Sequence, residues 1–306
     1  MRVLVTGGAG FIGSHVVDTL LENGHSVSVI DNLSTGHPGH VRPRISFYGV
    51  DVTEPGLERV FAQVQPNVVV HLAAQVRVPY SVSAPHVDAR TNILGSIAVL
   101  EAARRVGVRK VIYASSAAVY GAPLYLPLDE AHPIAPLSPY GVSKFAVERY
   151  LAVYEQLYGL RYTILRYANV YGPRQDAEGE AAVVARFTAA IARGAPATVF
   201  GSGEQTRDFV YVGDVAQANL MALERGDGMV INIGTGRATS IRELLATMRQ
   251  IAGIHVDEEV APARSGDIEH SWLKNHVARE ALGWTPSVDL PTGLAFTLSS
   301  LARKAA

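Results

Sequence analysis

The chain of 306 residues contains no cysteine. Disulfide bonds, thiolate-bound metals and a cysteine nucleophile are therefore excluded, and any catalysis must use other groups. Neither sign of charge predominates, because 27 Lys and Arg residues stand against 28 Asp and Glu residues. Without a surplus of positive charge, little attracts the chain to a nucleic-acid backbone or an anionic membrane, and we expect neither as a partner.

Long hydrophobic runs are also missing. No stretch approaches the roughly 18 apolar residues that a membrane-spanning helix needs, and the apolar stretch before Gly7 is too short for a signal peptide. Apolar residues nevertheless make up 48% of the chain and charged residues only 18%, which is typical of a packed globular protein. We therefore expect a soluble, cytoplasmic protein with one main core and a smaller second part, since single cores rarely exceed roughly 250–300 residues.

Short β-branched segments alternate with longer amphipathic ones through the first 170 residues. The predicted strands cover residues 3–5, 26–30, 45–48, 68–71, 110–114 and 162–166, and the predicted helices cover residues 11–22, 87–106 and 139–158. This alternation is typical of a parallel sheet with helices on both faces. We predict an α/β protein with a Rossmann-type, doubly wound parallel sheet of six or more strands.

The pattern changes after residue 173, where a polar stretch precedes shorter elements. A helix up to residue 193, short strands at 197–200 and 208–212, and a helix at 240–252 predict a smaller, mixed α/β part. A helix at 214–224 and a strand at 229–233 are expected to return to the first sheet. The predicted division is therefore 1–170 for the first domain, with returns near 208–235, and mainly 171–306 for the second.

A glycine-rich segment follows the first predicted strand and opens the first predicted helix. Gly7, Gly10 and Gly13 suit, in turn, a tight turn, close approach of a pyrophosphate to the backbone, and close packing of helix on strand. Asp31 ends the second predicted strand, where a carboxylate accepts hydrogen bonds from both ribose hydroxyls and repels a 2′-phosphate. Together they predict a site for NAD rather than NADP; the simpler alternative is a packing turn with a solvated Asp31.

Tyr140 and Lys144 lie four residues apart in the predicted helix that Ser138 would cap and Pro139 would begin. At this spacing they share one helix face, and a neighbouring ammonium lowers the pKa of a phenol from its value of about 10 in water. A surface pair is the alternative for these two residues alone. Ser116 ends the fifth predicted strand, at the edge where such sheets bind ligands, so the three residues predict a catalytic site; a simple strand-end cap is the other interpretation of this serine.

Several further segments, taken with those above, carry a resemblance to a known family. In the first domain they are 31–36, 51–52, 71–74, Asn92 and 115–121; in the second they are 166–175, 201–208, 264–267 and 282–284. Over nearly its whole length the chain resembles the NAD-dependent epimerase/dehydratase family of extended short-chain dehydrogenases/reductases. Within that family it is most similar to the 4-epimerases of UDP-hexoses.

The resemblance implies a role for individual residues. The catalytic residues would be Tyr140, Lys144 and Ser116. NAD would be bound by Gly7, Gly10, Phe11, Ile12, Gly13, Asp31, Asn32, Asp51, Val52, Leu72, Ala73, Ala74, Asn92, Tyr140, Lys144 and Tyr167. The UDP-sugar substrate would be bound by Ser116, Tyr140, Asn169, Phe200, Arg207, Arg264, Asp267 and Ser271.

The implied reaction is reversible epimerisation at C4 of a UDP-hexose through a 4-keto sugar. Tyr140 would be the base, while Arg207 and Arg264 would anchor the diphosphate. Alternatives are other enzymes of the family, namely a UDP-glucuronate epimerase or decarboxylase or a 4,6-dehydratase, and, less favoured, a non-catalytic dinucleotide sensor. Ala117 and Ala118 argue against dehydration, because they stand where dehydratases carry an acidic pair. The family also implies a homodimer formed by helices such as 87–106 and 139–158.

Three positions bear on specificity. Ser265 replaces the proline that usually follows the second diphosphate arginine, and Val76 stands where some members have a pyrophosphate-binding lysine. Ser271 occupies the position, seven residues after Arg264, at which a tyrosine excludes N-acetyl groups in related 4-epimerases. A serine there is expected to leave room for UDP-N-acetylglucosamine.

Ten histidines raise the question of a metal site. His37 and His40 are the closest pair, but a site needs three or four ligands and no others cluster nearby, so we predict no metal and expect solvated loop histidines. His71 ends an apolar strand and is expected to be a hydrogen-bonded core residue.

Overall fold

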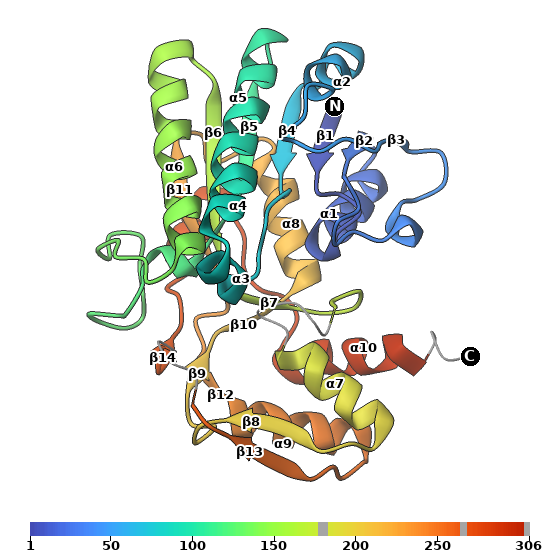
Figure 1. Ribbon diagram of the computed structural model, residues 1–306, viewed down its shortest axis with the longest axis vertical. Coiled ribbons are helices and arrows are strands. Elements are labelled where there is room, and N and C mark those ends of the chain that lie inside the picture. The colour runs from blue at the N-terminus through green and yellow to red at the C-terminus, as the bar shows by residue number, and fades with distance from the viewer. Residues whose placement is uncertain (177–182, 264–267, 303–306) are drawn as a thin grey trace.

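Seven parallel strands form the main sheet of the protein (Figure 1). The computed structural model describes residues 1–176, 183–263 and 268–302. Across the sheet the strand order is β11-β6-β5-β4-β1-β2-β3. The strands are β1 (Arg2–Thr6), β2 (Ser26–Ile30), β3 (Ser46–Tyr48), β4 (Val68–His71), β5 (Lys110–Ser116), β6 (Arg161–Tyr167) and β11 (Met229–Ile233). Because the chain winds outward from β1 in both directions, the predicted doubly wound sheet of the Rossmann type is confirmed.

Helices cover both faces of this sheet. On one face α1 (Phe11–Glu22) packs against α8 (Val212–Ala222); on the other, α5 (Gly95–Arg105) lies between α2 (Leu57–Val64) and α6 (Pro139–Tyr158). Strand β1 supplies both cores, since Val3 and Val5 belong to the first and Leu4 to the second. Strand side chains alternate between faces, so a continuous apolar run is what a sheet covered on both sides requires.

Helix α6 begins and ends at residues that suit a helix terminus. The Ser138 hydroxyl accepts a hydrogen bond from the backbone N–H of Gly141, and Pro139 occupies the first turn. The helix ends at Gly159, whose φ of +68° is in the left-handed region. These ends place Tyr140 in the first turn of α6, near the carboxyl end of β5.

The segment predicted as one helix at 87–106 is interrupted, and that prediction is wrong in this respect. Helices α3 (Val78–Ser83) and α4 (Pro85–Ala89) are followed by the π-helical turn η2 (Arg90–Leu94), and only then by α5. A π-helical turn accommodates an extra residue and is often found at functional sites. Within this one, Asn92 is 1% exposed.

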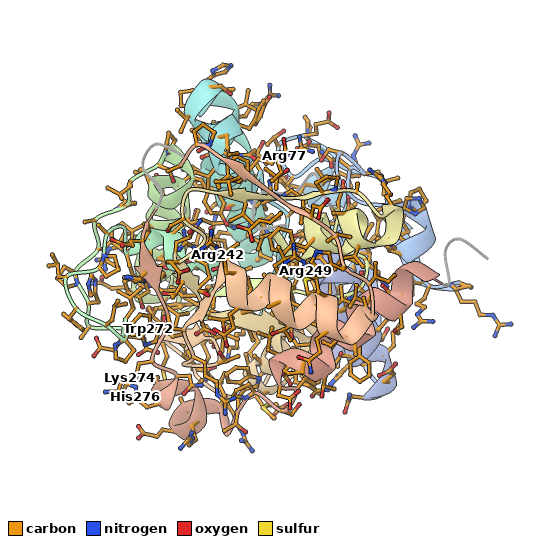
Figure 2. The ribbon with its side chains drawn as sticks, turned by 90° about the horizontal axis from the view of Figure 1, so that it is seen from below. Arg77, Arg242, Arg249, Trp272, Lys274 and His276 are labelled. Carbon is orange, nitrogen blue, oxygen red and sulfur yellow. The ribbon has the colours of Figure 1, made fainter. Side chains whose placement is uncertain are left out.

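The smaller part of the protein lies below the sheet in Figure 1 and has a core of its own. Its helices are α7 (Val183–Arg193), α9 (Ile241–Ala252) and α10 (Leu290–Ala302). Strand β8 (Ala197–Phe200) pairs with β13 (Glu258–Ala261), and β9 (Thr206–Arg207) lies between β12 (Thr239–Ser240) and β14 (His270–Ser271). Seen from below, α9 carries Arg242 and Arg249 (Figure 2), and Arg242 pairs with Glu258 at 3.3 Å.

The chain passes between the two parts more than once. Strand β7 (Asn169–Tyr171) pairs with β10 (Phe209–Tyr211), after which the chain returns to the sheet through α8 and β11, as predicted. The remaining short turns are η1 (Pro38–His40), η3 (Ala117–Val119) and η4 (Ala278–Leu282). On this arrangement we propose the domains as 1–170, with returns near 208–235, and mainly 171–306. Among the helices described, none combines the length and apolar character needed to cross a bilayer.

Candidate active site

A cavity of about 860 Å³ lies at the carboxyl ends of β1, β4, β5 and β6, between the sheet and the smaller part. The glycine-rich segment after β1 and the residues that follow β2 and β4 form one side. Residues of β8, β9 and β14 form the other. Open parallel sheets bind ligands at this edge, so the cavity is the candidate active site.

The glycine-rich turn has no space for side chains. Gly7 has a φ of +73°, and a Cβ on it would lie 2.7 Å from the backbone N of Ala73. A Cβ on Gly13 would lie 2.0 Å from the carbonyl oxygen of Gly7, so only glycine lets α1 begin this close to the turn. Gly10, Phe11 and Ile12 border the cavity at the start of α1, where unpaired N–H groups and the helix dipole attract an anion.

Asp31 follows β2 directly and is held at the cavity wall by two backbone groups. Its Oδ2 accepts a hydrogen bond from Ala9 N at 2.9 Å, and its Oδ1 accepts one from Leu33 N at 2.8 Å. A carboxylate oxygen can accept more than one hydrogen bond, so both oxygens retain capacity for a further donor. The arrangement suits a ribose diol and disfavours an additional phosphate.

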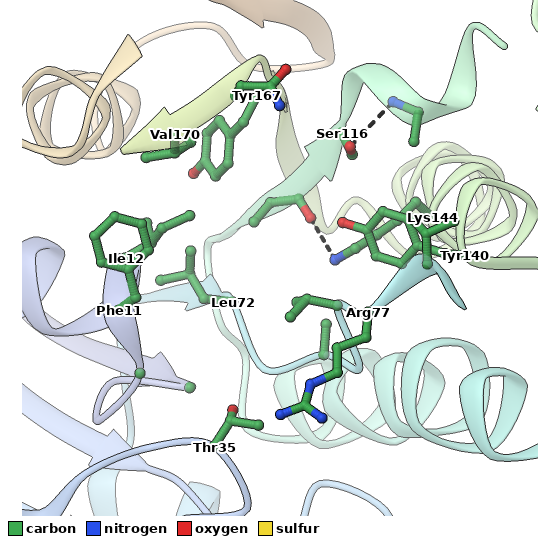
Figure 3. A pocket seen from close by; sticks show the side chains of 18 of the residues that line it. Phe11, Ile12, Thr35, Leu72, Arg77, Ser116, Tyr140, Lys144, Tyr167 and Val170 are labelled. Carbon is green, nitrogen blue, oxygen red and sulfur yellow. Dashed lines mark hydrogen bonds between the residues drawn. The ribbon is translucent and has the colours of Figure 1, made fainter. Parts of the chain in front are cut away.

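Tyr140 and Lys144 lie together at one wall of the cavity (Figure 3). The Lys144 ammonium is 5.8 Å from the centre of the Tyr140 ring and donates a hydrogen bond to Ala114 O at 2.9 Å. Lys144 is only 4% exposed, and this burial lowers its pKa to about 8. While protonated, the ammonium favours the phenolate form of Tyr140, and the amino-terminal end of α6 acts in the same direction.

The two serines that end β5 have different surroundings. The Ser115 hydroxyl donates to the carboxylate of Glu148 on α6. The Ser116 hydroxyl accepts a hydrogen bond from Ala118 N at 3.2 Å and lines the cavity on the same side as Tyr140 (Figure 3). Ser116 therefore caps the turn η3 and also faces the site, so the two interpretations of this residue are compatible.

The other residues predicted to bind the cofactor lie in the cavity wall, except one. Those in the wall are Asn32, Asp51, Val52, Leu72, Ala73, Ala74 and Tyr167. The structure does not bring Asn92 to the cavity. Its amide instead holds the segment after β4, because Gln75 N donates to Asn92 Oδ1 at 2.8 Å and Asn92 Nδ2 donates to Gln75 O at 3.0 Å.

The other residues predicted to bind the substrate, besides Ser116 and Tyr140, lie on the side of the smaller part. Asn169, Phe200, Arg207 and Ser271 line the cavity there. Parallel pairing of β14 with β9 sets Ser271 opposite Arg207. The predicted Arg264 and Asp267, and the variant position Ser265, lie outside the described residues.

Sequence analysis gave no role to several polar residues of the cavity wall, namely Thr35, Arg77, Arg186, Thr198 and Gln205. Arg77 extends from the segment after β4 toward Thr35 (Figure 3). It directly follows Val76, so a cation is present beside the position at which some family members have a lysine. The signal for Arg77 is its location in a loop at the carboxyl end of a strand, but no fixed spacing marks it.

One ion-pair cluster joins segments on either side of α1. Asp18 Oδ1 accepts a hydrogen bond from Arg42 Nε at 2.6 Å, and Asp18 Oδ2 accepts one from an Arg174 terminal nitrogen at 2.7 Å. Arg42 belongs to the segment after β2 and Arg174 to the segment after β7. Burial acts to raise the pKa of Asp18, but the two arginine hydrogen bonds outweigh it and hold that pKa below its ordinary value. We refer to these three residues as the Asp18 clasp.

Of the two loop histidines expected to be solvated, His37 is exposed, whereas His40 is partly buried, with its Nδ1 3.0 Å from Ala9 O. The rings of His37 and His40 are 5.3 Å apart, and His37 Nδ1 accepts a hydrogen bond from Gly39 N. In the part of the chain that the structure describes, no three His, Asp or Glu side chains form a group able to hold a metal ion. His71 contacts the hydroxyls of Thr6 and Ser96, and burial lowers its pKa to about 3, so it is the neutral core residue that was expected.

Comparison with known proteins gives a family match and several similar solved structures. The model of the NAD dependent epimerase/dehydratase family matches residues 3–234. The crystal structure of Thermotoga maritima UDP-glucose 4-epimerase with UDP-glucose is 46% identical, with a TM-score of 0.98 and complete coverage of both chains. Thermus thermophilus UDP-glucose 4-epimerase, in complex with NAD, is 44% identical, with a TM-score of 0.95 and complete coverage of both chains. The UDP-N-acetylglucosamine 4-epimerase of Methanobrevibacter ruminantium, in complex with UDP-N-acetylmuramic acid, is 36% identical, with a TM-score of 0.94 over 99% of this chain and 98% of that one.

Proposed function

The chain belongs to the NAD-dependent epimerase/dehydratase family, and from this premise we propose that it is an NAD-dependent isomerase that inverts C4 of a UDP-hexose such as UDP-glucose or UDP-galactose. The observation that carries the proposal is the position of Tyr140, Lys144 and Ser116 on one wall of the cavity that the glycine-rich turn borders. The UDP-glucose and NAD complexes of relatives at 46% and 44% identity support it.

The residues of the cavity fit NAD. The turn at Gly7 and Gly13 has no room for a Cβ and lets a pyrophosphate approach the backbone at the start of α1. Asp31 is held directly after β2, the strand next to β1, and its carboxylate suits the adenosine ribose. Lys144 would hold the nicotinamide ribose. When bound, NAD supplies reversible hydride transfer with C4 of the sugar.

The side chains of the site then have distinct tasks. Tyr140, as a phenolate, takes the proton of the sugar 4-hydroxyl, directly or through the Ser116 hydroxyl, and returns it after the sugar has turned. Lys144 favours that phenolate. Arg207, together with Arg264, would hold the diphosphate. Because the diphosphate then stays fixed, the 4-keto ring can turn and present either face. The cycle ends with no net oxidation or reduction.

The residues after Ser116 favour epimerisation over the other reactions of the family. Ala117 and Ala118 form the turn η3 beside the site. Neither side chain can protonate a departing C6 hydroxyl or remove a C5 proton. A dehydratase or a decarboxylase is therefore a weaker alternative, and the Tyr140 and Lys144 pair gives a non-catalytic dinucleotide sensor no support.

We further propose that the protein is a cytoplasmic homodimer. Several apolar side chains of α6 are exposed, including Val142, Val153 and Leu157, the last at 63%. Leu94, the last residue of η2 before α5, is also exposed. Exposed apolar side chains on adjacent helices suit a two-fold interface. Multi-angle light scattering should give twice the chain mass for the native protein. The double variant Val153→Lys, Leu157→Lys should have the mass of a single chain.

The experiment that tests the activity is incubation of the purified protein with single UDP-sugars, followed by NMR and mass analysis of the products. UDP-glucose or UDP-galactose alone should give a mixture of both, with unchanged mass. A product lighter by one water from either sugar, or carbon dioxide from UDP-glucuronate, would contradict the proposal in favour of the corresponding alternative.

A further inference from the structure

A buried carboxylate with no part in the mechanism lies behind the catalytic helix. Asp88 of α4 is 1% exposed, and α4 packs against α6. Its Oδ1 accepts hydrogen bonds from Gln75 Nε2 at 2.9 Å and from Asn92 Nδ2 at 3.0 Å. Its Oδ2 is buried without a hydrogen-bond partner. Both donors are neutral amides, so the carboxylate is buried with no cation bonded to it.

Hydrogen bonds connect Asp88 to the helical turn that carries Tyr140 and Lys144. Asn92 Nδ2 also contacts the Ser143 hydroxyl at 3.1 Å, and that hydroxyl donates to Tyr140 O at 3.0 Å. Asn92 lies in the π-helical turn η2, four residues after Asp88. The interruption of the predicted helix thus places an amide between the carboxylate of α4 and the first turn of α6.

The other ionisable groups around Lys144 contribute little net charge. On α6, Glu148 is paired with Arg166 of β6 through two hydrogen bonds of 3.0 and 2.6 Å, and both side chains are buried. On β4, His71 is neutral, because burial lowers its pKa to about 3. On β5, burial raises the pKa of Tyr113 well above its ordinary value, so this phenol is also neutral. Among these groups, Asp88 is the carboxylate whose hydrogen bonds come only from neutral amides.

We propose that Asp88 is a positioning residue for the reaction assigned above, whose uncompensated buried charge keeps the Lys144 ammonium protonated and whose Oδ1 fixes Asn92 and the first turn of α6. The inference deepens the proposed function and rests on it for the role of Lys144 in turnover. The charge effect itself is a property of the folded chain and can be measured without substrate.

The pKa of Lys144 supports this direction. Burial lowers that pKa to about 8, while the charges of Asp88 and Glu148 oppose the decrease. Replacement of Asp88 by a neutral residue removes one of these opposing charges, so the ammonium should lose its proton at a lower pH. Lys144 would then be neutral at a pH where the native enzyme works.

Asp88→Asn is the sharpest test, because its amide oxygen can still accept the hydrogen bonds of Gln75 and Asn92 while the charge is lost. The chain has only four lysines, Lys110, Lys144, Lys274 and Lys304. Lysine labelled with ¹³C at Cε therefore gives four titrating signals, and Lys144→Met identifies the one of interest. We expect Asp88→Asn to lower the pKa of Lys144 by about 1 unit, and the alkaline limb of the kcat profile to move down with it.

Asp214→Asn is the matched control. Asp214 is a buried carboxylate that accepts hydrogen bonds from Ser287 and Val288 on the opposite face of the sheet. Its replacement should reduce stability without moving the Lys144 titration. If Asp88→Asn does not fold, Asp88→Ser, which is smaller and also neutral, gives the same measurement. An unchanged Lys144 titration in the folded variant would overturn the inference, whereas a shifted titration in a protein that converts no UDP-sugar would leave it standing and overturn the proposed function.

Discussion

At the scale of single residues, Tyr140 is the group on which proton transfer depends. We expect Tyr140→Phe to lower kcat by about 10³-fold, since a positioned base contributes roughly 10²–10⁴-fold and phenylalanine preserves the packing of the ring. Turnover of UDP-galactose measures the loss. The far-ultraviolet circular dichroism spectrum and NAD affinity should match those of the native protein, and a variant that retained a tenth of the native kcat would show that another group is the base.

Asp31 determines the preference for the cofactor. Because its carboxylate is held in place by Ala9 N and Leu33 N, it cannot easily turn away from a 2′-phosphate. We expect protein freed of bound nucleotide to bind NAD roughly 100-fold more tightly than NADP, a difference of about 3 kcal/mol. Titration calorimetry with both nucleotides checks this, and equal affinities would refute the role given to Asp31.

Some of these residues could be predicted from the sequence because their function depends on neighbours in the chain. Gly7, Gly13, Tyr140 and Lys144 act through a turn or a helix, whose geometry follows from spacing. Asn92, Asp88 and Arg77 could not be assigned in this way. Their surroundings come from segments distant in sequence, such as α6 for Asp88 and the residues after β2 for Arg77.

At the scale of elements, the pairing of β14 with β9 decides what lies beside the substrate anchor. Ser271 is opposite Arg207 in this pair and lines the cavity. We expect the protein to convert UDP-N-acetylglucosamine as well as UDP-glucose, because a serine leaves space of the order of an aromatic ring. The relative whose structure has a TM-score of 0.94 is a UDP-N-acetylglucosamine 4-epimerase.

The matching variant is Ser271→Tyr, which should remove activity on the N-acetylated sugar by steric overlap and spare activity on UDP-glucose. Separate kcat/KM values for the two sugars check the prediction, and Ser271→Ala, which keeps the space open, is the control. Native discrimination of roughly 10³-fold against the N-acetylated sugar would mean that another side chain fills this space.

The helix expected at 87–106 shows what periodicity omits. An amphipathic pattern predicts that a segment is helical, but it does not distinguish a continuous helix from one interrupted by a π-helical turn, because both keep one face apolar. The turn η2 is stabilised by contacts of Asn92 with Gln75 and Ser143. These are tertiary contacts, and the hydrophobic pattern contains no record of them.

At the scale of the whole molecule, the main sheet was predictable and the joint between the two parts was not. The strands of the sheet are buried on both faces and read as apolar runs, which also identified the returning strand β11. The joint includes polar contacts between segments distant in sequence, such as the Asp18 clasp and the hydrogen bond between His15 Nε2 and Pro173 O. Such contacts leave no periodic signal.

The Asp18 clasp should make part of the stability depend on pH. The pKa of Asp18 is lowered in the folded protein, so its contribution is present above the unfolded value of about 3.9 and is lost as the pH falls through the folded value. We expect Asp18→Asn to lower the free energy of unfolding at pH 7 by about 1 kcal/mol relative to the native protein, as measured by urea denaturation. This difference should shrink below about pH 4. A difference that stays constant into acid would assign the loss to packing instead of charge.

The clasp also bears on cooperativity between ligands. Arg42 and Arg174 share one carboxylate, and their segments border the two halves of a single cavity. A ligand that draws Arg174 toward itself therefore changes the ion pair between Asp18 and Arg42. Thermodynamic linkage then requires symmetry: whatever factor a UDP-sugar imposes on the affinity for NAD, NAD imposes on the affinity for the UDP-sugar. The size of that shared factor, measured with and without the Asp18 carboxylate, would show how much of the coupling passes through the clasp.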